Sequence, residues 1–305
     1  MRKCSPGMNR LYLLGIALAF GCQAEIAGDL DDSSGPDGAP DMPADAGAEP
    51  DALVLGAWAT PEPIPGAADA TNGEDDNTLS STATELIYAV SVPGGTTGKD
   101  LFVMTRPDTS SPWTAPEALT EFNTDIQEET PRLSPDDLTL YFGRGGDIYS
   151  STRTAVGAAW SAPTLVDTVS TTEYEKWLAV CDGGRALISR YNPVSESQDL
   201  YEGTLADGAP TLVAGFSTAG NEISAFLTED CLTAYYASNG DGEMQIYTAT
   251  RATPTGPWST PTLAPSPFND GTLDEDAWIS PDQRTFVFAS TRDGATTKDL
   301  YISTR

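Results

Sequence analysis

Apolar residues in this chain gather in short runs that turn-forming residues separate. Beyond the first 20 residues, these runs are rich in β-branched and aromatic side chains, and Gly, Pro, Asp and Ser fill the intervals. No such segment keeps the 3.6-residue apolar period of a helix buried on one face. The pattern therefore predicts many short antiparallel strands. The clearest runs are residues 86–90, 140–142, 186–189, 234–237 and 286–289.

One tripeptide recurs along the chain: an Asp or Gln, then an aliphatic residue, then an aromatic residue. Its copies begin at Asp100, Asp147, Asp199, Gln245 and Asp299, at intervals of 46 to 54 residues. A repeat of this length suits a propeller blade of four strands and is too long for most helical repeats. Five copies predict five blades.

Two further motifs divide each repeat. Trp-x-x-Pro begins at Trp113, Trp160 and Trp258, 13 residues after the start of the tripeptide, and it is degenerate in the third repeat. A Ser-Pro-Asp turn occupies residues 134–136 and 280–282, and the other repeats carry weaker versions. One repeat therefore contains a short inner strand, this turn, an apolar second strand, a third strand with the tripeptide, and an outer strand.

The segments LSPDDLTLYF…DIY (133–149) and ISPDQRTFVF…DLY (279–301) resemble the repeat of TolB-type (WD40-like) β-propellers of bacterial envelope proteins. The resemblance covers residues 56–305 and implies an all-β, five-bladed β-propeller. It is less informative about function, because members of this family bind many different ligands.

The last copy of the tripeptide leaves no room for an outer strand, because only four residues follow it. Near the other end of the propeller region, Trp58 to Pro61 form a Trp-x-x-Pro that no tripeptide precedes. We expect residues 56–65 to supply the missing outer strand. This pairing would close the ring and leave no exposed sheet edge at the junction.

The N-terminus is typical of an export signal. Basic residues precede an apolar run from Leu11 to Phe20, which is too short to span a bilayer, and the run ends in Ala-Phe-Gly-Cys. This ending resembles a bacterial lipobox and predicts a lipidated Cys22. Gln23 follows it, which points to an outer-membrane lipoprotein, periplasmic or surface-exposed. The alternative is an ordinary secretory signal cut near Ala24.

These features predict three segments: a lipoprotein signal peptide (1–21), a disordered Asp/Ala/Gly/Pro-rich tether (22–52), and the propeller (53–305). The tether has almost nothing to bury and so cannot offset the entropy of folding. The chain has 45 acidic and 16 basic residues, a net charge of −29. Such a field repels nucleic acid and attracts cations or a basic partner. We expect a monomer that meets a membrane only through its lipid.

Acidic residues recur just before the inner strands, where they would surround one mouth of the central channel. The functional interpretation is a site for a basic ligand or a cation such as calcium. The alternative is that these acids cap turns, which five-fold recurrence itself predicts. The candidates are Glu74, Asp76, Glu128, Glu129, Glu173, Glu175, Glu222, Asp274 and Glu275.

Tryptophan and arginine recur with the repeat as well. Trp177 and Trp278 fall on inner strands, where either core packing or ligand contact would suit them. The Trp residues of the Trp-x-x-Pro motif are expected to pack between strands. Thr-Arg pairs at the ends of third strands, such as Thr105-Arg106, are expected to be solvated or to pair with nearby acids.

Catalysis lacks its usual residues. The chain has no His, so His-dependent nucleophile and metal schemes are excluded. The sequence favours a non-catalytic envelope binding module that presents a face to a protein or peptide. The alternative is a carbohydrate-binding propeller or a glycoside hydrolase that uses two carboxylates. A structural scaffold is a third interpretation.

Cys181 and Cys231 remain in the propeller after export, in an oxidising compartment. Repeat alignment places both in the turn after the inner strand, in neighbouring blades. Adjacent blades approach most closely there, so a disulfide is feasible. Two buried free thiols are the alternative.

Overall fold

The computed structural model describes residues 55–67, 72–91 and 98–305. The predicted signal peptide, tether and Cys22 lie outside these residues. The regular secondary structure of the described part consists of strands and two short 3-10 turns, at Asp182–Gly184 and Arg292–Gly294. No helix in it is long and apolar enough to cross a membrane.

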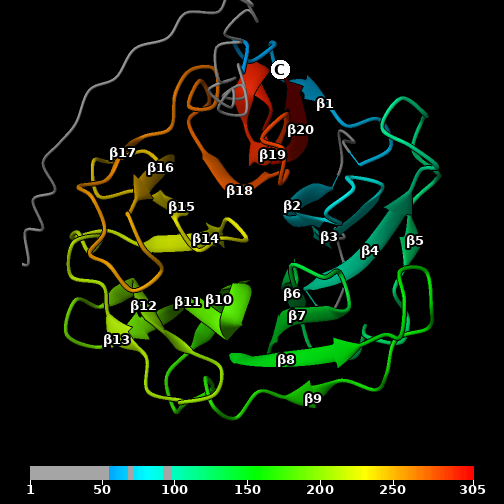
Figure 1. Cartoon of the computed structure of the whole chain (residues 1–305). Coiled ribbons are helices and arrows are strands. Elements are labelled where there is room, and N and C mark those ends of the chain that lie inside the picture. Colours follow the sequence, from blue (N-terminus) through cyan, green and yellow to red (C-terminus); the bar gives the residue numbers. More distant parts are fainter. Residues whose placement is uncertain (1–54, 68–71, 92–97) are drawn as a thin grey trace, which may run out of the picture. The chain divides into compact units, whose positions relative to one another are not determined.

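Five four-stranded antiparallel sheets surround a central axis (Figure 1), which confirms the predicted five-bladed propeller. The inner strands, one per blade, are β2 (Gly73–Leu79), β6 (Glu128–Leu133), β10 (Glu175–Cys181), β14 (Glu222–Leu227) and β18 (Asp274–Ile279). The second strands are β3 (Glu85–Ser91), β7 (Thr139–Arg144), β11 (Arg185–Asn192), β15 (Thr233–Ser238) and β19 (Thr285–Ser290).

The tripeptides lie on the third strands, as the repeat predicts. These strands are β4 (Lys99–Thr105), β8 (Asp147–Thr152), β12 (Ser197–Thr204), β16 (Gln245–Thr250) and β20 (Asp299–Thr304). The outer strands are only two residues long: β5 (Glu117–Ala118), β9 (Thr164–Leu165), β13 (Thr211–Leu212), β17 (Thr262–Leu263) and, in the last blade, β1 (Glu62–Pro63).

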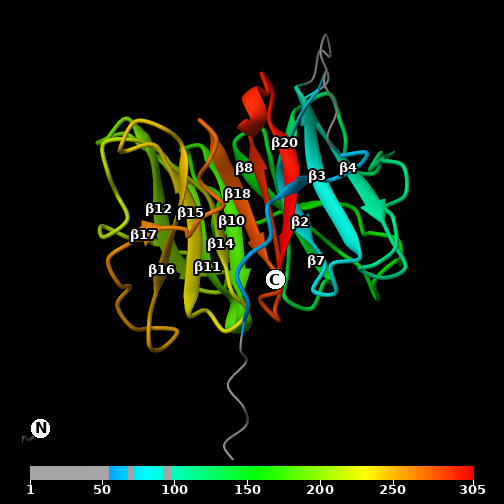
Figure 2. The same cartoon turned by 90° about the horizontal axis from the view of Figure 1, so that it is seen from above.

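The N-terminal strand completes the last blade, as the sequence predicts. Strand β1 lies beside β20 (Figure 2), with Glu62 opposite Ile302 and Pro63 opposite Tyr301. The amide of Ala59 also donates to the carbonyl of Thr304, at 2.8 Å. The ring is therefore closed by hydrogen bonds between the two ends of the propeller.

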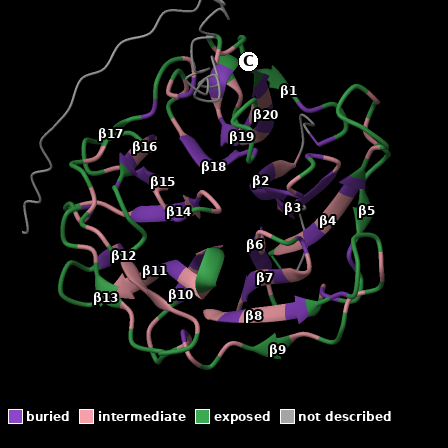
Figure 3. Ribbon diagram, in the orientation of Figure 1, coloured by how far each residue is buried: buried purple, intermediate pink, exposed green. Residues whose placement is uncertain are grey.

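The hydrophobic core lies between blades, where the face of one sheet packs on the next. Ile87 and Leu101 of the first blade, for example, form one cluster with Leu140 and Phe142 of the second. Figure 3 shows buried residues on the inner and middle strands and exposed ones on the outer loops. Because each sheet packs against the sheets before and after it, residues near the axis contact both neighbouring blades.

Four inner strands carry a β-bulge near the axis. The residues at these irregularities adopt left-handed φ values of 54° to 58°, although none is glycine: Asp76, Thr130, Ser224 and Asp276. Such a conformation is strained, most of all for β-branched Thr130, and bulges re-aim the side chains around them. The irregularity in β10 falls one residue earlier, between Glu175 and Trp177.

The Thr-Arg and Trp-x-x-Pro motifs form one structural unit, so the prediction of solvated or acid-paired arginines was incomplete. Each guanidinium stacks over the Trp of its own blade, at 3.9 to 4.3 Å from the ring centroid, in four blades. The Nε of the same Arg donates to the carbonyl of a left-handed turn residue, as Arg106 does to Ala83 at 2.9 Å. Stacking and a fixed hydrogen bond together hold the outer strand against the blade.

Candidate functional site at the two ends of the propeller axis

The inner strands all run in the same direction along the axis, so the axis has two chemically different ends. We call the end where these strands begin the strand-start end. We call the other, formed by the turns that follow the inner strands, the turn end. The predicted acidic residues lie at the strand-start end.

In four blades, the recurring acid at the start of the inner strand mainly holds its own blade together. Both oxygens of Glu128 accept bonds from Thr124, at 2.9 Å from the amide and 2.6 Å from the hydroxyl, and Arg144 donates to one of them. The equivalent acids are fully buried and have equivalent partners: Glu175 with Thr171 and Arg190, Glu222 with Thr218 and Ser238, and Asp274 with Gly271 and Ser290. These contacts are the turn-capping arrangement that recurrence predicts.

Two other predicted acids occupy the same end. The amide of Glu74 donates to the carbonyl of Lys298, which joins the first blade to the last. Glu173 lies on the loop before β10, where its amide donates to Thr171 Oγ1, and its side chain is partly exposed.

The acids one or two residues further along the strands form a buried ion network. Lys99 Nζ lies 2.7 Å from Asp75 Oδ1 and 2.5 Å from Asp76 Oδ2. Lys298 Nζ contacts both Asp75 and Glu275. The three carboxylates are at most 5 % exposed, and the two lysines come from the starts of third strands in the first and last blades. The chain thus supplies its own cations to the strand-start end.

The electrostatics of this network follow from burial and pairing. Burial disfavours the charged form of Asp76, but Lys99, Lys176 and Lys298 outweigh it and hold the pKa of Asp76 below its usual range. Burial likewise disfavours the charged form of Lys99, yet Asp76 and Asp75 raise its pKa above the usual value. Lysine and aspartate are therefore both charged at neutral pH.

Asp276 behaves in the opposite way. Its Oδ2 accepts a bond from the backbone amide of Asp76 at 2.9 Å. One carboxylate oxygen of each of the two residues lies within 4.8 Å of the other, across the junction of two blades. Burial first, and then the charges of Asp76 and Glu275, raise the pKa of Asp276 to about 7. Two neighbouring carboxyl groups with pKa values moved apart can share one proton.

Glu129, Lys176 and Trp177 extend the network into the second and third blades. Lys176 Nζ lies 2.9 Å from Glu129 Oε2 and 4.3 Å from the centroid of the Trp177 ring. The indole of Trp177 donates to Asp76 Oδ1 at 3.2 Å, and Tyr174 OH donates to Glu129 Oε1 at 2.9 Å. Trp177 therefore packs within the network, buried at 4 % exposure.

Asp75, Asp76 and Asp276 are the described residues that could hold a metal ion here, because one oxygen from each lies within 4.8 Å of the others. Carboxylate oxygens are ligands that calcium prefers. The ammonium groups of Lys99 and Lys298 already contact the carboxylate of Asp75, however. A cation at this position would compete with both lysines.

The turn end contains an open cavity of about 330 Å³. All five blades contribute to it. Its apolar wall includes Leu133, Phe226 and Trp278, and the indole of Trp278 meets Phe226 edge-on with ring centroids 6.4 Å apart. Trp278 thus lies in a cavity, although at the end opposite the predicted acidic mouth.

The charged residues that line this cavity are all acidic: Asp137, Asp182, Glu229 and Asp230. Asp137 accepts bonds from both the amide and the hydroxyl of Ser81, and Asp230 accepts bonds from Thr228 and Leu232 within its own turn. Within the described part of the chain, the carboxylates of Asp182 and Glu229 make no hydrogen bond or ion pair. Burial, and then Asp182 and Asp137, raise the pKa of Glu229.

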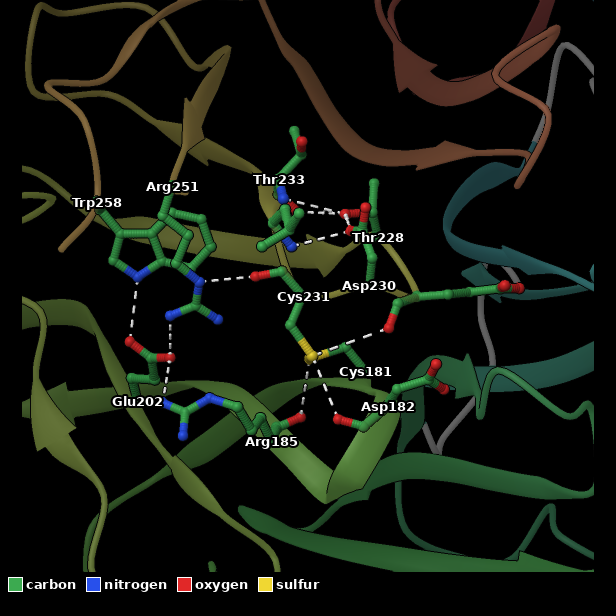
Figure 4. Close-up of a disulfide and its surroundings, with 12 residues drawn as sticks. Cys181, Asp182, Arg185, Glu202, Thr228, Asp230, Cys231, Thr233, Arg251 and Trp258 are labelled. Atoms are coloured by element: carbon green, nitrogen blue, oxygen red, sulfur yellow. Dashed lines mark hydrogen bonds and ion pairs between the residues drawn. A yellow bond between two sulfur atoms is a disulfide. The ribbon is translucent and has the colours of Figure 1, made fainter. Parts of the chain in front are cut away.

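The structure brings Cys181 and Cys231 together in a disulfide between the third and fourth blades (Figure 4), with the Cα atoms 5.4 Å apart. The bridge joins the two turns that carry Asp182 and Glu229, and the amide of Asp182 donates to the carbonyl of Glu229 at 2.9 Å. Strand register places Cys181 at the position of Ser134, because the turn of the third blade is one residue shorter.

Sequence reasoning overlooked the lysines and the turn-end acids. Lys99 and Lys298 each precede the tripeptide, at the same repeat position, where the other blades carry Gly146, Gln198 and Met244. That recurrence in two blades was a detectable signal. The signal for Asp182 and Glu229 was that they replace the Pro of the Ser-Pro-Asp turn.

No family model and no curated protein matches the sequence. Solved structures with this fold include an endo-arabinase from Bacteroides thetaiotaomicron (13 % identity, TM-score 0.53, 80 % of this chain and 96 % of that chain). A family 117 glycoside hydrolase from Zobellia galactanivorans is also similar (10 % identity, TM-score 0.50, 81 % and 89 %). A TolB from Agrobacterium tumefaciens matches at 17 % identity and a TM-score of 0.47 (71 % and 69 %). At these identities, the likeness to the endo-arabinase and to the family 117 glycoside hydrolase shows the fold alone.

Proposed function

We propose that this chain is a non-catalytic binding module of the bacterial cell envelope, and that it binds a protein or peptide partner at the turn end of the propeller. One observation carries the proposal. The turn end has an open cavity with an apolar wall and two carboxylates that no described residue engages. A concave apolar site with a few polar groups is the usual form of a binding site.

The carboxylates at the strand-start end are poorly suited to catalysis, which also favours a binding module. These carboxylates are buried and already paired with Lys99, Lys176 and Lys298. A carboxylate that serves as general base or nucleophile must reach the substrate. These groups would have to give up strong ion pairs to do so.

The test of binding uses the domain 53–305 as bait in an extract of the envelope. Pro281 lines the cavity at a turn position where other blades carry Ser81, Asp182 and Glu229, so the turn does not require proline there. Pro281→Arg should fill part of the cavity and abolish capture of the partner. Glu173→Gln, at the strand-start end, is the matched control and should capture it normally. Equal capture by the Pro281 variant and the wild type would refute the assignment of this end.

A carboxylate-pair glycoside hydrolase is the second candidate, and the observation in its favour is the Asp76–Asp276 pair. Their pKa values move in opposite directions, as those of an acid and a base must. Hydrolysis of aryl glycosides or of arabinan by the wild type, lost in both Asp76→Asn and Asp276→Asn, would establish this function. The absence of turnover with wild type leaves the binding module as the assignment.

The envelope location rests on the N-terminal sequence. We propose that Cys22 carries lipid and anchors the chain in the outer membrane, with the propeller periplasmic or surface-exposed. Cys22→Ser should release the protein from the membrane fraction and end incorporation of labelled palmitate. A variant that remains in the membrane fraction and still takes up label would refute the anchor.

A further inference from the structure

We infer that the turn-end cavity binds a positively charged, apolar peptide segment, with Asp182 and Glu229 as the residues that recognise its charge. The inference rests on the proposed function and deepens it by naming the chemistry of the partner.

Asp182 and Glu229 are not required by the fold of the blade. Both occupy the second position of the turn after the inner strand, where the other blades have Ser81, Pro135 and Pro281. The recurring acids serve the blade, as the bonds of Glu128 and its equivalents in three other blades show. Asp182 and Glu229 replace Ser or Pro in only two neighbouring blades, and their carboxylates make no comparable bond to a described residue.

The disulfide holds these two acids at the same side of the cavity. It links residues immediately beside them, and the Asp182–Glu229 backbone bond fixes the turns further. None of the described residues that line the cavity is basic, so none compensates the charges. Like charges held together in this way repel each other, and a bound cation relieves the repulsion.

The wall of the cavity specifies more than a cation. Phe226, Trp278 and Leu133 present apolar surface beside the acids. A small hydrated ion would leave that surface without a partner, and an anion would be repelled. About 330 Å³ is at the lower end of ligand-pocket volumes, so the site suits one or two side chains of a peptide rather than a folded surface. An Arg or Lys next to a Leu or aromatic residue meets each requirement.

The experiment titrates the disulfide-intact domain with three capped hexapeptides by calorimetry. The peptides share alternating Leu positions and carry Arg, Gln or Glu at the other three. We expect the Arg peptide to bind at least tenfold more tightly than the Gln peptide, and the Glu peptide to bind more weakly still. Affinity for the Arg peptide should fall when NaCl rises from 50 to 300 mM, because the charges are near the surface.

The matched variant is Asp182→Asn with Glu229→Gln, which keeps shape and removes charge. The double variant should lower the affinity for the Arg peptide at least tenfold and leave the affinity for the Gln peptide unchanged. Glu173→Gln should change neither affinity. Equal affinity for the Arg and Gln peptides, no effect of the double variant, or no binding by any of the peptides would overturn the inference.

The two proposals fail in different ways. If Pro281→Arg loses the envelope partner while the Asp182/Glu229 double variant retains it, the turn end binds a partner but not through these charges. In that case the proposed function stands and this inference is wrong. If Pro281→Arg retains the partner, the proposed function itself fails.

Discussion

Both ends of the propeller axis carry acidic residues, but the charges of these residues are compensated in different ways. At the strand-start end, Asp75, Asp76 and Glu275 are buried and paired with lysines from the same chain. At the turn end, Asp182 and Glu229 remain without a cation from any described residue. The first group of acids has partners within the chain, and the second is the site that we propose for a positively charged partner.

The difference shows how function can be sought in a repeat protein. An acid that occurs in every blade is explained by the geometry that every blade shares. An acid or a lysine that occurs in one or two blades needs a different explanation, because the remaining blades fold without it. By this criterion Lys99, Lys298, Asp182 and Glu229 are the informative residues, and Glu128 is not.

The sharpest test of the comparison removes a lysine from the strand-start end. Lys99→Met should leave Asp75 and Asp76 buried with one cation fewer and cost about 3–5 kcal/mol in the free energy of unfolding. Urea denaturation at neutral pH measures it. A loss below about 1 kcal/mol would mean that the network is hydrated and the two ends are alike.

Removal of the disulfide tests the turn end. The bridge closes a loop with a sequence separation of 50, so Cys181→Ser with Cys231→Ser should lower the free energy of unfolding by about 4 kcal/mol on the chain-entropy model. Thermal denaturation with and without reductant gives the difference. The unreduced, denatured wild-type domain should contain no free thiol in the propeller, and two titratable thiols would contradict the bridge.

The pH dependence of stability separates Asp276 from the other acids. Its pKa is about 7 in the fold and 3.8 in the reference state, so the folded form binds the extra proton between these values. The stability that this proton confers is therefore present in acid and is lost as pH rises through 7. Asp276→Asn should remove about 2–3 kcal/mol of the decline between pH 5 and 8.

Asp76→Asn is the control with the opposite sign. The lowered pKa of Asp76 contributes stability above the reference pKa, and that stability is lost as pH falls below it. The variant should therefore be less stable than the wild type at neutral pH. Parallel stability profiles for the wild type and Asp276→Asn would show that Asp276 ionises normally.

The smallest effect is expected at the acidic cavity. Asp182→Asn with Glu229→Gln should raise the free energy of unfolding by a few tenths of a kcal/mol, because it relieves repulsion near the surface without breaking a bond. The melting temperature at low salt is the measurement. A decrease of more than about 1 kcal/mol in the free energy of unfolding would show that Asp182 and Glu229 stabilise the blade, as Glu128 does.

The fold could be predicted in detail because the same sequence motifs recur in each blade. The interval between tripeptides gave the blade number, and the unpaired Trp58 motif gave the closing strand. The stacking of Arg106 on Trp113 was missed. The two residues recur in step, but sequence alone does not say that a recurring charge and a recurring ring face each other.

The site was harder to predict than the fold. The acids near the axis were identifiable, but their partners come from other blades: Lys298 is 223 residues from Asp75 along the chain and contacts it through ring closure. The bulges at Asp76 and Asp276 also alter which side chains meet at the axis, and no spacing rule reveals them. The cavity at the turn end depends on how five turns converge, which only the folded ring specifies.

The closing strand also gives the propeller a mechanical property. The strand that completes the last blade continues toward the N-terminus through Ala59 and Trp58, so tension on that side would reach the contacts of these two residues first and β1 after them. Hydrogen bonds across an antiparallel pair lie perpendicular to the strands, and a pull along β1 loads them in parallel rather than one after another. Arg305, the last residue of the chain, stacks 4.1 Å from the ring centroid of Trp58 beside that strand. A pull along β1 is therefore expected to act on these hydrogen bonds and on the contact between Arg305 and Trp58 at the same time.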